Sequence, residues 1–117
     1  MASFAGPNLE VDGLVLCLDA ANTQSYPGSG TTWTDISGED NNSTLTNGPT
    51  FSNDNGGSIV FDGSNDYIQL PTNSDLTLTG DFSYETWLLT DVQLTSNHIW
   101  QLSGDKTLQF SSNVSPD

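Results

Sequence analysis

The stretch Gly57-Ser58-Ile59-Val60-Phe61-Asp62-Gly63-Ser64-Asn65-Asp66-Tyr67-Ile68-Gln69-Leu70 shows the pattern on which the whole chain is built. Two short apolar runs, Ile59–Phe61 and Tyr67–Leu70, are rich in β-branched and aromatic residues. The five residues between them all favour turns, and Gly63 takes a positive φ without steric cost. Two such runs on either side of a turn cluster predict a β-hairpin.

The same alternation of short apolar runs and Ser, Thr, Asn, Asp or Gly clusters continues along all 117 residues. Acidic residues are twelve Asp against three Glu, and Asp favours turns over helix interiors. No stretch longer than a few residues has apolar residues at the i, i+3, i+4, i+7 spacing of an amphipathic helix. Further strands are predicted at Leu14–Asp19, Ser43–Thr46, Leu76–Thr79 and Phe82–Leu89, with a last hairpin from His98–Leu102 and Thr107–Phe110.

These strands predict an all-β fold, an antiparallel β-sandwich, with Gly-rich connections. The strand Leu14–Asp19 is apolar on both faces and is expected deep in a sheet. Residues 1–12, which contain Pro7, are predicted to form an extended N-terminal arm. The sandwich domain is then expected to span residues 13–117.

The charge of the chain excludes several partners. Its formal net charge is −14, and Lys106 is its one cationic Lys or Arg side chain. A surface without a cationic patch does not bind nucleic acid, and it repels anionic lipid headgroups. No run approaches the roughly 20 apolar residues of a membrane span. Cys17 is the only cysteine, so no intrachain disulfide forms, and a buried, inert thiol is expected.

Four stretches in order together resemble one family. They resemble the laminin-G-like branch of the concanavalin A-like lectin/glucanase fold, in the version found in structural proteins of tailed bacteriophages of marine and cyanobacterial hosts. The likeness covers roughly residues 12–110. It implies a jelly-roll sandwich that serves sugar binding, adhesion or a purely structural role. The stretches that carry it are Gly13–Ala20, Ser25–Gly38, Leu45–Phe51 and Ser58–Ile68.

The chain departs from this family in two respects. Glu39, Asp40 and Ser43 stand where the family has more glycine. The fold is also expected to be shortened at the C-terminus, because the last predicted strand ends near Phe110. Missing strands would leave open sheet edges, so other subunits are expected to cover them in an oligomer or assembly.

Catalysis is not expected. Glycosidases of this fold need a pair of carboxylates on one strand, whereas Glu85 has only Asp81 nearby, outside the predicted strand. His98 is the only histidine and has no acidic neighbour. No cofactor is predicted, except that Asp62, Asn65 and Asp66 offer the hard oxygen ligands that Ca²⁺ prefers. The alternative for these residues is hydrogen bonding within their own turn.

Sugar binding would need exposed aromatic rings beside polar loops. Tyr26, Trp33 and Tyr67 are the candidates, and Tyr26 is expected to be exposed because it lies in a Pro-Gly turn. The favoured function is a non-enzymatic virion structural protein, a capsid decoration or tail-appendage domain, made in the host cytoplasm. Its partners would be other virion proteins, bound through the N-terminal arm and the open sheet edges. The alternative is a carbohydrate-binding adhesion module that recognises host-surface glycans.

Overall fold

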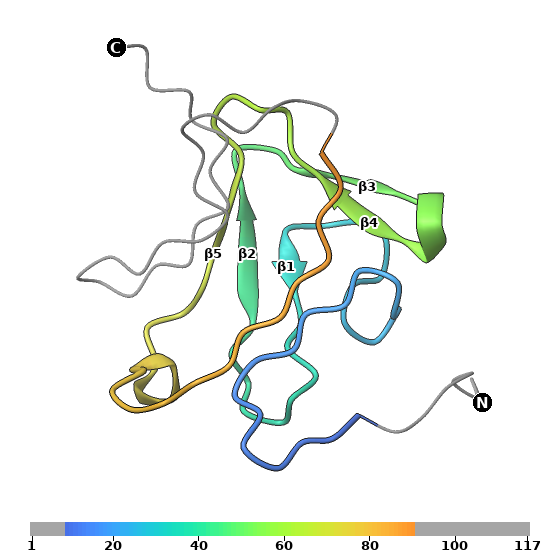
Figure 1. Ribbon diagram of the computed structural model, residues 1–117. Coiled ribbons are helices and arrows are strands. Elements are labelled where there is room, and N and C mark those ends of the chain that lie inside the picture. Colours follow the sequence, from blue (N-terminus) through green and yellow to red (C-terminus); the bar gives the residue numbers. More distant parts are fainter. Residues whose placement is uncertain (1–8, 91–117) are drawn as a thin grey trace.

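A computed structural model of the chain describes residues 9–90, which contain short strands and two single-turn helices (Figure 1). Most of the remaining chain in this range is turns and irregular segments. No helix in residues 9–90 has the length and apolarity that crossing a bilayer requires. The elements are β1 (Thr32–Trp33), β2 (Ser43–Thr46), β3 (Thr50–Ser52), the 3-10 helix η1 (Asp54–Gly56), β4 (Ser58–Val60), β5 (Tyr67–Gln69) and the 3-10 helix η2 (Ser74–Leu76).

The strands form two antiparallel sheets. One sheet has the order β1-β2-β5, with Leu45 of β2 opposite Ile68 of β5. The other sheet is the pair β3-β4, with Phe51 opposite Ile59. This part of the chain is therefore all-β and antiparallel, as the sequence pattern predicts.

The predicted hairpin across residues 59–70 is wrong. Both of its runs are strands, but β4 pairs with β3, and β5 pairs with β2. The turn that closes β3 on β4 is the shorter one, residues 53–57, where Asn55 and Gly56 adopt left-handed backbone conformations. Residues 61–66 instead form a corner that carries the chain from one sheet to the other (Figure 1).

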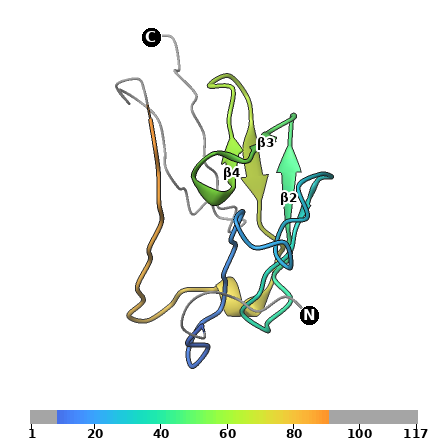
Figure 2. The ribbon, with the colours of Figure 1, turned by 90° about the vertical axis from the view of Figure 1, so that its right-hand side faces the viewer.

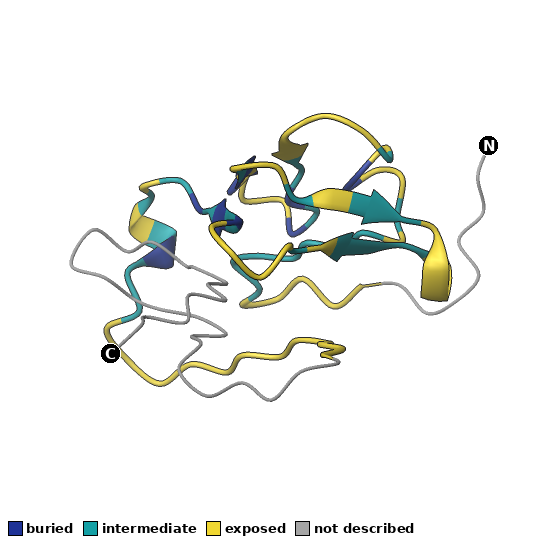
Figure 3. Cartoon of the chain, turned by 90° about the horizontal axis from the view of Figure 1, so that it is seen from above, coloured by how far each residue is buried: buried dark blue, intermediate teal, exposed yellow. Residues whose placement is uncertain are grey.

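Side chains from both sheets pack into one apolar cluster. Its buried members are Tyr26, Leu45 of β2 and Ile68 of β5. Phe51 of β3 and Ile59 of β4 pack against them from the second sheet. A second cluster, Leu70 and Leu76 with Val15, Leu16 and Leu18 around them, extends the core towards η2, where Leu76 is the buried residue (Figure 3).

Three predicted strands are not strands in the structure. In residues 14–19, positions 14–18 are half-buried and Asp19 is exposed. The side chains of Asp35 and Asn41 bind backbone groups of this segment in place of a neighbouring strand. Leu76 ends η2, and residues 77–79 are irregular. Residues 81–90 run as an exposed segment along one side of the molecule (Figures 2 and 3). The predicted hairpin of residues 98–110 lies outside the described residues.

Candidate functional site

A buried carboxylate, Asp35, joins the half-buried N-terminal segment to the loop after β1. Its Oδ1 accepts hydrogen bonds from the backbone N–H groups of Cys17 at 2.8 Å and Ser37 at 2.9 Å. Its Oδ2 accepts from the Ser37 hydroxyl at 2.7 Å and from the Asn41 N–H at 3.0 Å. Four donors satisfy this carboxylate entirely within the chain, so its role is to hold the backbone in place.

Asn41 continues this network on the other side of the loop. Its side chain is fully buried, and its Nδ2 donates to the carbonyl of Val15 at 2.8 Å. Its Oδ1 accepts from Asn73 Nδ2 at 2.7 Å, and Asn73 in turn caps η2 by accepting from the Asp75 N–H. We call Asp35, Asn41 and Asn73 the polar network. It links segments more than 30 residues apart, because Asn41 and Asn73 are separated by 32 positions.

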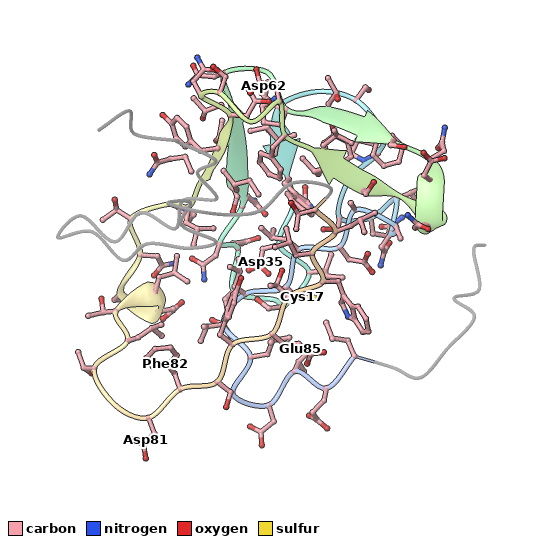
Figure 4. All side chains as sticks on the ribbon, turned by 45° about the horizontal axis from the view of Figure 1, so that its top comes forward. Cys17, Asp35, Asp62, Asp81, Phe82 and Glu85 are labelled. Atoms are coloured by element: carbon pink, nitrogen blue, oxygen red, sulfur yellow. The ribbon has the colours of Figure 1, made fainter. Side chains whose placement is uncertain are left out.

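The polar network was not predicted, although part of it has a local signal. An Asp or Asn that accepts from the N–H two residues later makes an Asx-turn, and Asp35 with Ser37 has this spacing. The contact to Cys17, 18 residues away, has no such signal. Figure 4 shows Asp35 and Cys17 next to each other at the centre of the molecule.

The three predicted metal ligands lie together at the corner between the sheets. Asp66 is 3% exposed, and its Oδ2 accepts from the Asp62 N–H at 3.0 Å, while its buried Oδ1 has no hydrogen-bond partner. Asp62 is exposed, and its Oδ1 accepts from the Ser64 N–H at 2.8 Å. Among residues 9–90, no group of three or more His, Cys, Asp or Glu side chains is placed to hold a metal ion. The Ca²⁺ site stays a prediction, and the unpartnered oxygen of Asp66 makes it testable.

A Ca²⁺ ion bound at this corner should raise the melting temperature, because a ligand that binds only the folded state stabilises it by about 2.7 kcal/mol at 100 times its Kd. Thermal melts with excess Ca²⁺ and with EDTA measure the difference. The Asp66→Asn variant should lose the shift, and the exposed Asp54→Asn variant on η1 should keep it. Identical melting temperatures of the wild-type chain in Ca²⁺ and in EDTA would exclude the site.

The predicted exposure of Tyr26 is wrong. Its ring is 3% exposed, and its hydroxyl donates to the carbonyl of Gly30 at 2.8 Å. The Tyr26 N–H bonds to the Asn22 carbonyl at 2.8 Å, and this turn directs the ring into the core. There it meets the ring of Trp33 edge-on at 6.4 Å and that of Phe51 at 5.5 Å. Tyr26 therefore offers no free face on which a sugar could stack, whereas Trp33 and Tyr67 are half-buried.

The acidic residues considered for catalysis lie on the exposed C-terminal part of the described chain. Asp81 and Glu85 are both exposed, and Figure 4 shows them at separate places along this segment. His98 lies outside the described residues. Neither acid is held by a described hydrogen bond of the kind that positions a catalytic carboxylate, so the arrangement gives no mechanism to derive.

Cys17 is the one nucleophilic thiol of the described residues, and its surroundings disfavour the thiolate. Burial raises the pKa of Cys17 above its ordinary value, and the negative charges of Asp19 and Asp35 raise it further. A raised pKa lowers the thiolate fraction at neutral pH, and the thiolate is the reactive form.

We therefore expect iodoacetamide to alkylate Cys17 more slowly in the folded chain than in the chain unfolded in urea. The rate should still be rising with pH where that of the unfolded thiol has levelled off. Mass spectrometry of the alkylated chain measures both rates. Equal rates in the folded and unfolded chains would show that the fold does not protect this thiol.

The corner and the polar network both lie in a β-rich part of the chain, in which the buried side chains of Asp35 and Asn41 bind backbone groups of residues 14–19. The chain was compared with family models, with curated proteins and with solved structures, and none of them matches it.

Proposed function

We propose that this chain is a non-enzymatic structural domain of a virus particle, and that it contacts neighbouring protein subunits through residues 87–89. The virion assignment is supported by the resemblance of four sequence stretches to structural proteins of tailed bacteriophages. The contact surface is supported by one observation: Trp87 is 95% exposed and Leu89 86% exposed. We call Trp87, Leu88 and Leu89 the apolar segment.

The apolar segment is unusual for the surface of so acidic a chain. Three large apolar side chains follow one another, and Leu88 is also exposed, at 50%. Burying a Trp or Leu side chain stabilises a complex by about 1.5–3 kcal/mol relative to leaving it in water. Trp is also among the residues that most often dominate the binding energy of protein interfaces. A partner that covers these side chains would therefore gain most of its affinity there.

The buried carboxylate of Asp35 holds the backbone N–H groups of Cys17 and Asn41 in place, which fits a structural role. The arm of residues 1–12 is a second proposed contact, and its described part, residues 9–12, is exposed. An exposed arm can add a strand to a neighbouring subunit. Because Tyr26 is buried, we do not carry the carbohydrate-binding alternative further.

The double variant Trp87→Ser/Leu89→Ser tests the contact surface. The wild-type chain should self-associate at high concentration, and loss of the two apolar side chains should weaken that association by roughly 30-fold, since a central Trp contributes about 2 kcal/mol or more. Sedimentation velocity over a concentration series measures this. Val60→Ser is the matched control, because Val60 is an exposed apolar residue on β4, at 46%, and is not part of the apolar segment.

Particle assembly provides the second arm of the experiment. In particles that carry the chain, the double variant should fail to incorporate, whereas Val60→Ser should incorporate normally. A wild-type chain that stays monomeric at high concentration, and a double variant that incorporates normally, would contradict the proposed contact.

A further inference from the structure

Two Asn-Gly pairs lie in turns of the described structure, and the side-chain amides of their asparagines differ in hydrogen bonding. Asn47, directly after β2, donates its Nδ2 hydrogen to the carbonyl of Asn65 at 2.8 Å. Asn55, in the middle of η1, is exposed, and its side chain makes no hydrogen bond among residues 9–90. Both have left-handed backbones, with φ of 69° for Asn47 and 57° for Asn55.

We propose that Asn55 is a site of spontaneous deamidation and isomerisation, and that Asn47 is protected from the same reaction. The backbone nitrogen of Gly56 attacks Cγ of Asn55, and a new N–Cγ bond closes a five-membered succinimide. The Cγ–Nδ2 bond breaks, and Nδ2 leaves as ammonia with the proton that Gly56 gives up. Water then opens the ring at either carbonyl, and the product is aspartate or isoaspartate.

Glycine at position 56 favours this reaction, because it has no Cβ to hinder the attacking nitrogen and leaves the backbone free to rotate. Asn55 is followed by two glycines, Gly56 and Gly57, and it lies in a single exposed turn rather than in a paired strand. The attack requires Asn55 to leave its left-handed conformation for a moment, and the exposed position of Asn55 permits such local opening.

Asn47 is also followed by a glycine, Gly48, but its side chain is held in a different environment. Its Nδ2 donates a hydrogen bond to the carbonyl of Asn65. This bond joins the turn between β2 and β3 to the corner between the sheets. The succinimide cannot form unless this hydrogen bond breaks and Nδ2 turns away. Asn47 also stands next to β2, which pairs with strands on both sides. Both features oppose the rotation that brings the Gly48 nitrogen to Cγ.

Reaction at Asn55 would change the hairpin of β3 and β4. Isoaspartate adds a methylene group to the main chain two residues before Gly57, whose backbone lies against Ala20 and Ala21. A longer main chain at this point would disturb that contact. The reaction also adds one negative charge to a chain that already carries −14.

The test is prolonged incubation of the full chain at neutral and mildly alkaline pH, followed by proteolytic digestion and mass spectrometry of the two peptides. In urea, residues 47 and 55 should deamidate at similar rates, because both precede glycine. In the folded chain, Asn55 should react roughly fivefold faster than Asn47, the factor that corresponds to one hydrogen bond. The Asn55→Gln variant should lose the product at position 55 and leave the rate at Asn47 unchanged.

Isoaspartate at position 55, detected by methylation with a protein isoaspartate methyltransferase, should accompany the aspartate product. Aspartate alone would exclude the succinimide route. A folded chain in which the two rates keep their ratio from urea, or in which Asn47 reacts faster, would overturn the proposal.

Discussion

Replacing Asp35 with alanine should lower the free energy of unfolding by about 3–6 kcal/mol, a large part of the about 5–15 kcal/mol that a small domain has. The substitution leaves the N–H groups of Cys17, Ser37 and Asn41 without their acceptor in a region from which water is largely excluded. Each unsatisfied buried donor costs about 1–3 kcal/mol. The half-buried segment of residues 14–19 would lose one of the hydrogen bonds that hold it in place.

Urea unfolding followed by circular dichroism measures this effect. Asp54→Ala is the matched control, because it also removes one negative charge but from an exposed residue of η1, and it should change stability by less than about 0.5 kcal/mol. Asp35→Asn should fall between the two, since its amide keeps one acceptor oxygen and loses the other. If Asp35→Ala stayed within about 1 kcal/mol of the wild-type chain, the polar network would not be what holds this region together.

Replacing Gly57 with alanine should destabilise the chain by about 3 kcal/mol or more, because two separate costs add. Gly57 has a φ of 133°, a backbone conformation that residues other than glycine rarely adopt. A Cβ atom there would also lie 2.6 Å from the carbonyl oxygen of Ala20 and 2.9 Å from Cα of Ala21. Both are backbone atoms, so the turn at residues 20–21 would have to move as a whole.

Gly48→Ala separates these two costs. Gly48 also has a positive φ, 103°, but a Cβ atom there would meet nothing within 4 Å. It should cost only the backbone strain, about 1–2 kcal/mol. Thermal or urea melts of the two variants give the difference, which measures how closely η1 and β4 approach the Ala20 turn. Equal losses in the two variants would mean that this approach is looser than the structure has it.

The sequence pattern predicts where strands lie better than how they pair. Ser43–Thr46 is a strand with the predicted bounds, and both runs of the opening stretch contain strands. Their pairing could not be predicted, because the alternation of side chains is a local property, whereas the choice of partner depends on contacts distant in the sequence. Leu45 and Ile68 meet across β2 and β5 although 22 residues lie between them.

The prediction of an all-β antiparallel fold is confirmed for the described residues, and the sandwich stays a proposal. Two sheets share one apolar cluster, in which Phe51 and Ile59 of the β3-β4 pair meet Leu45 and Ile68. The segment Leu14–Asp19 shows why apolar character alone misleads. It is expected deep in a sheet, but residues 14–18 are only half-buried and Asp19 is exposed. Asp35 and Asn41 bind its backbone in place of the predicted neighbouring strand.

The candidate site was predicted only in part. The residues of the corner, Asp62, Asn65 and Asp66, do lie together, because they are neighbours in one turn. Tyr26 could not be placed from its Pro-Gly surroundings, since its ring packs against Trp33 and Phe51, which lie farther along the chain. The polar network was missed because Asp, Asn and Ser in a loop usually face water, and only the fold shows that Asp35 and Asn41 are buried.

Residues 61–66 carry the chain from one sheet to the other, rather than closing a hairpin. Cross-strand nuclear Overhauser effects between backbone protons measure this pairing directly. The structure predicts contacts between Leu45 and Ile68 and between Phe51 and Ile59, and none between β4 and β5. Cross-strand contacts that join residues 59–61 to residues 67–70 would contradict it.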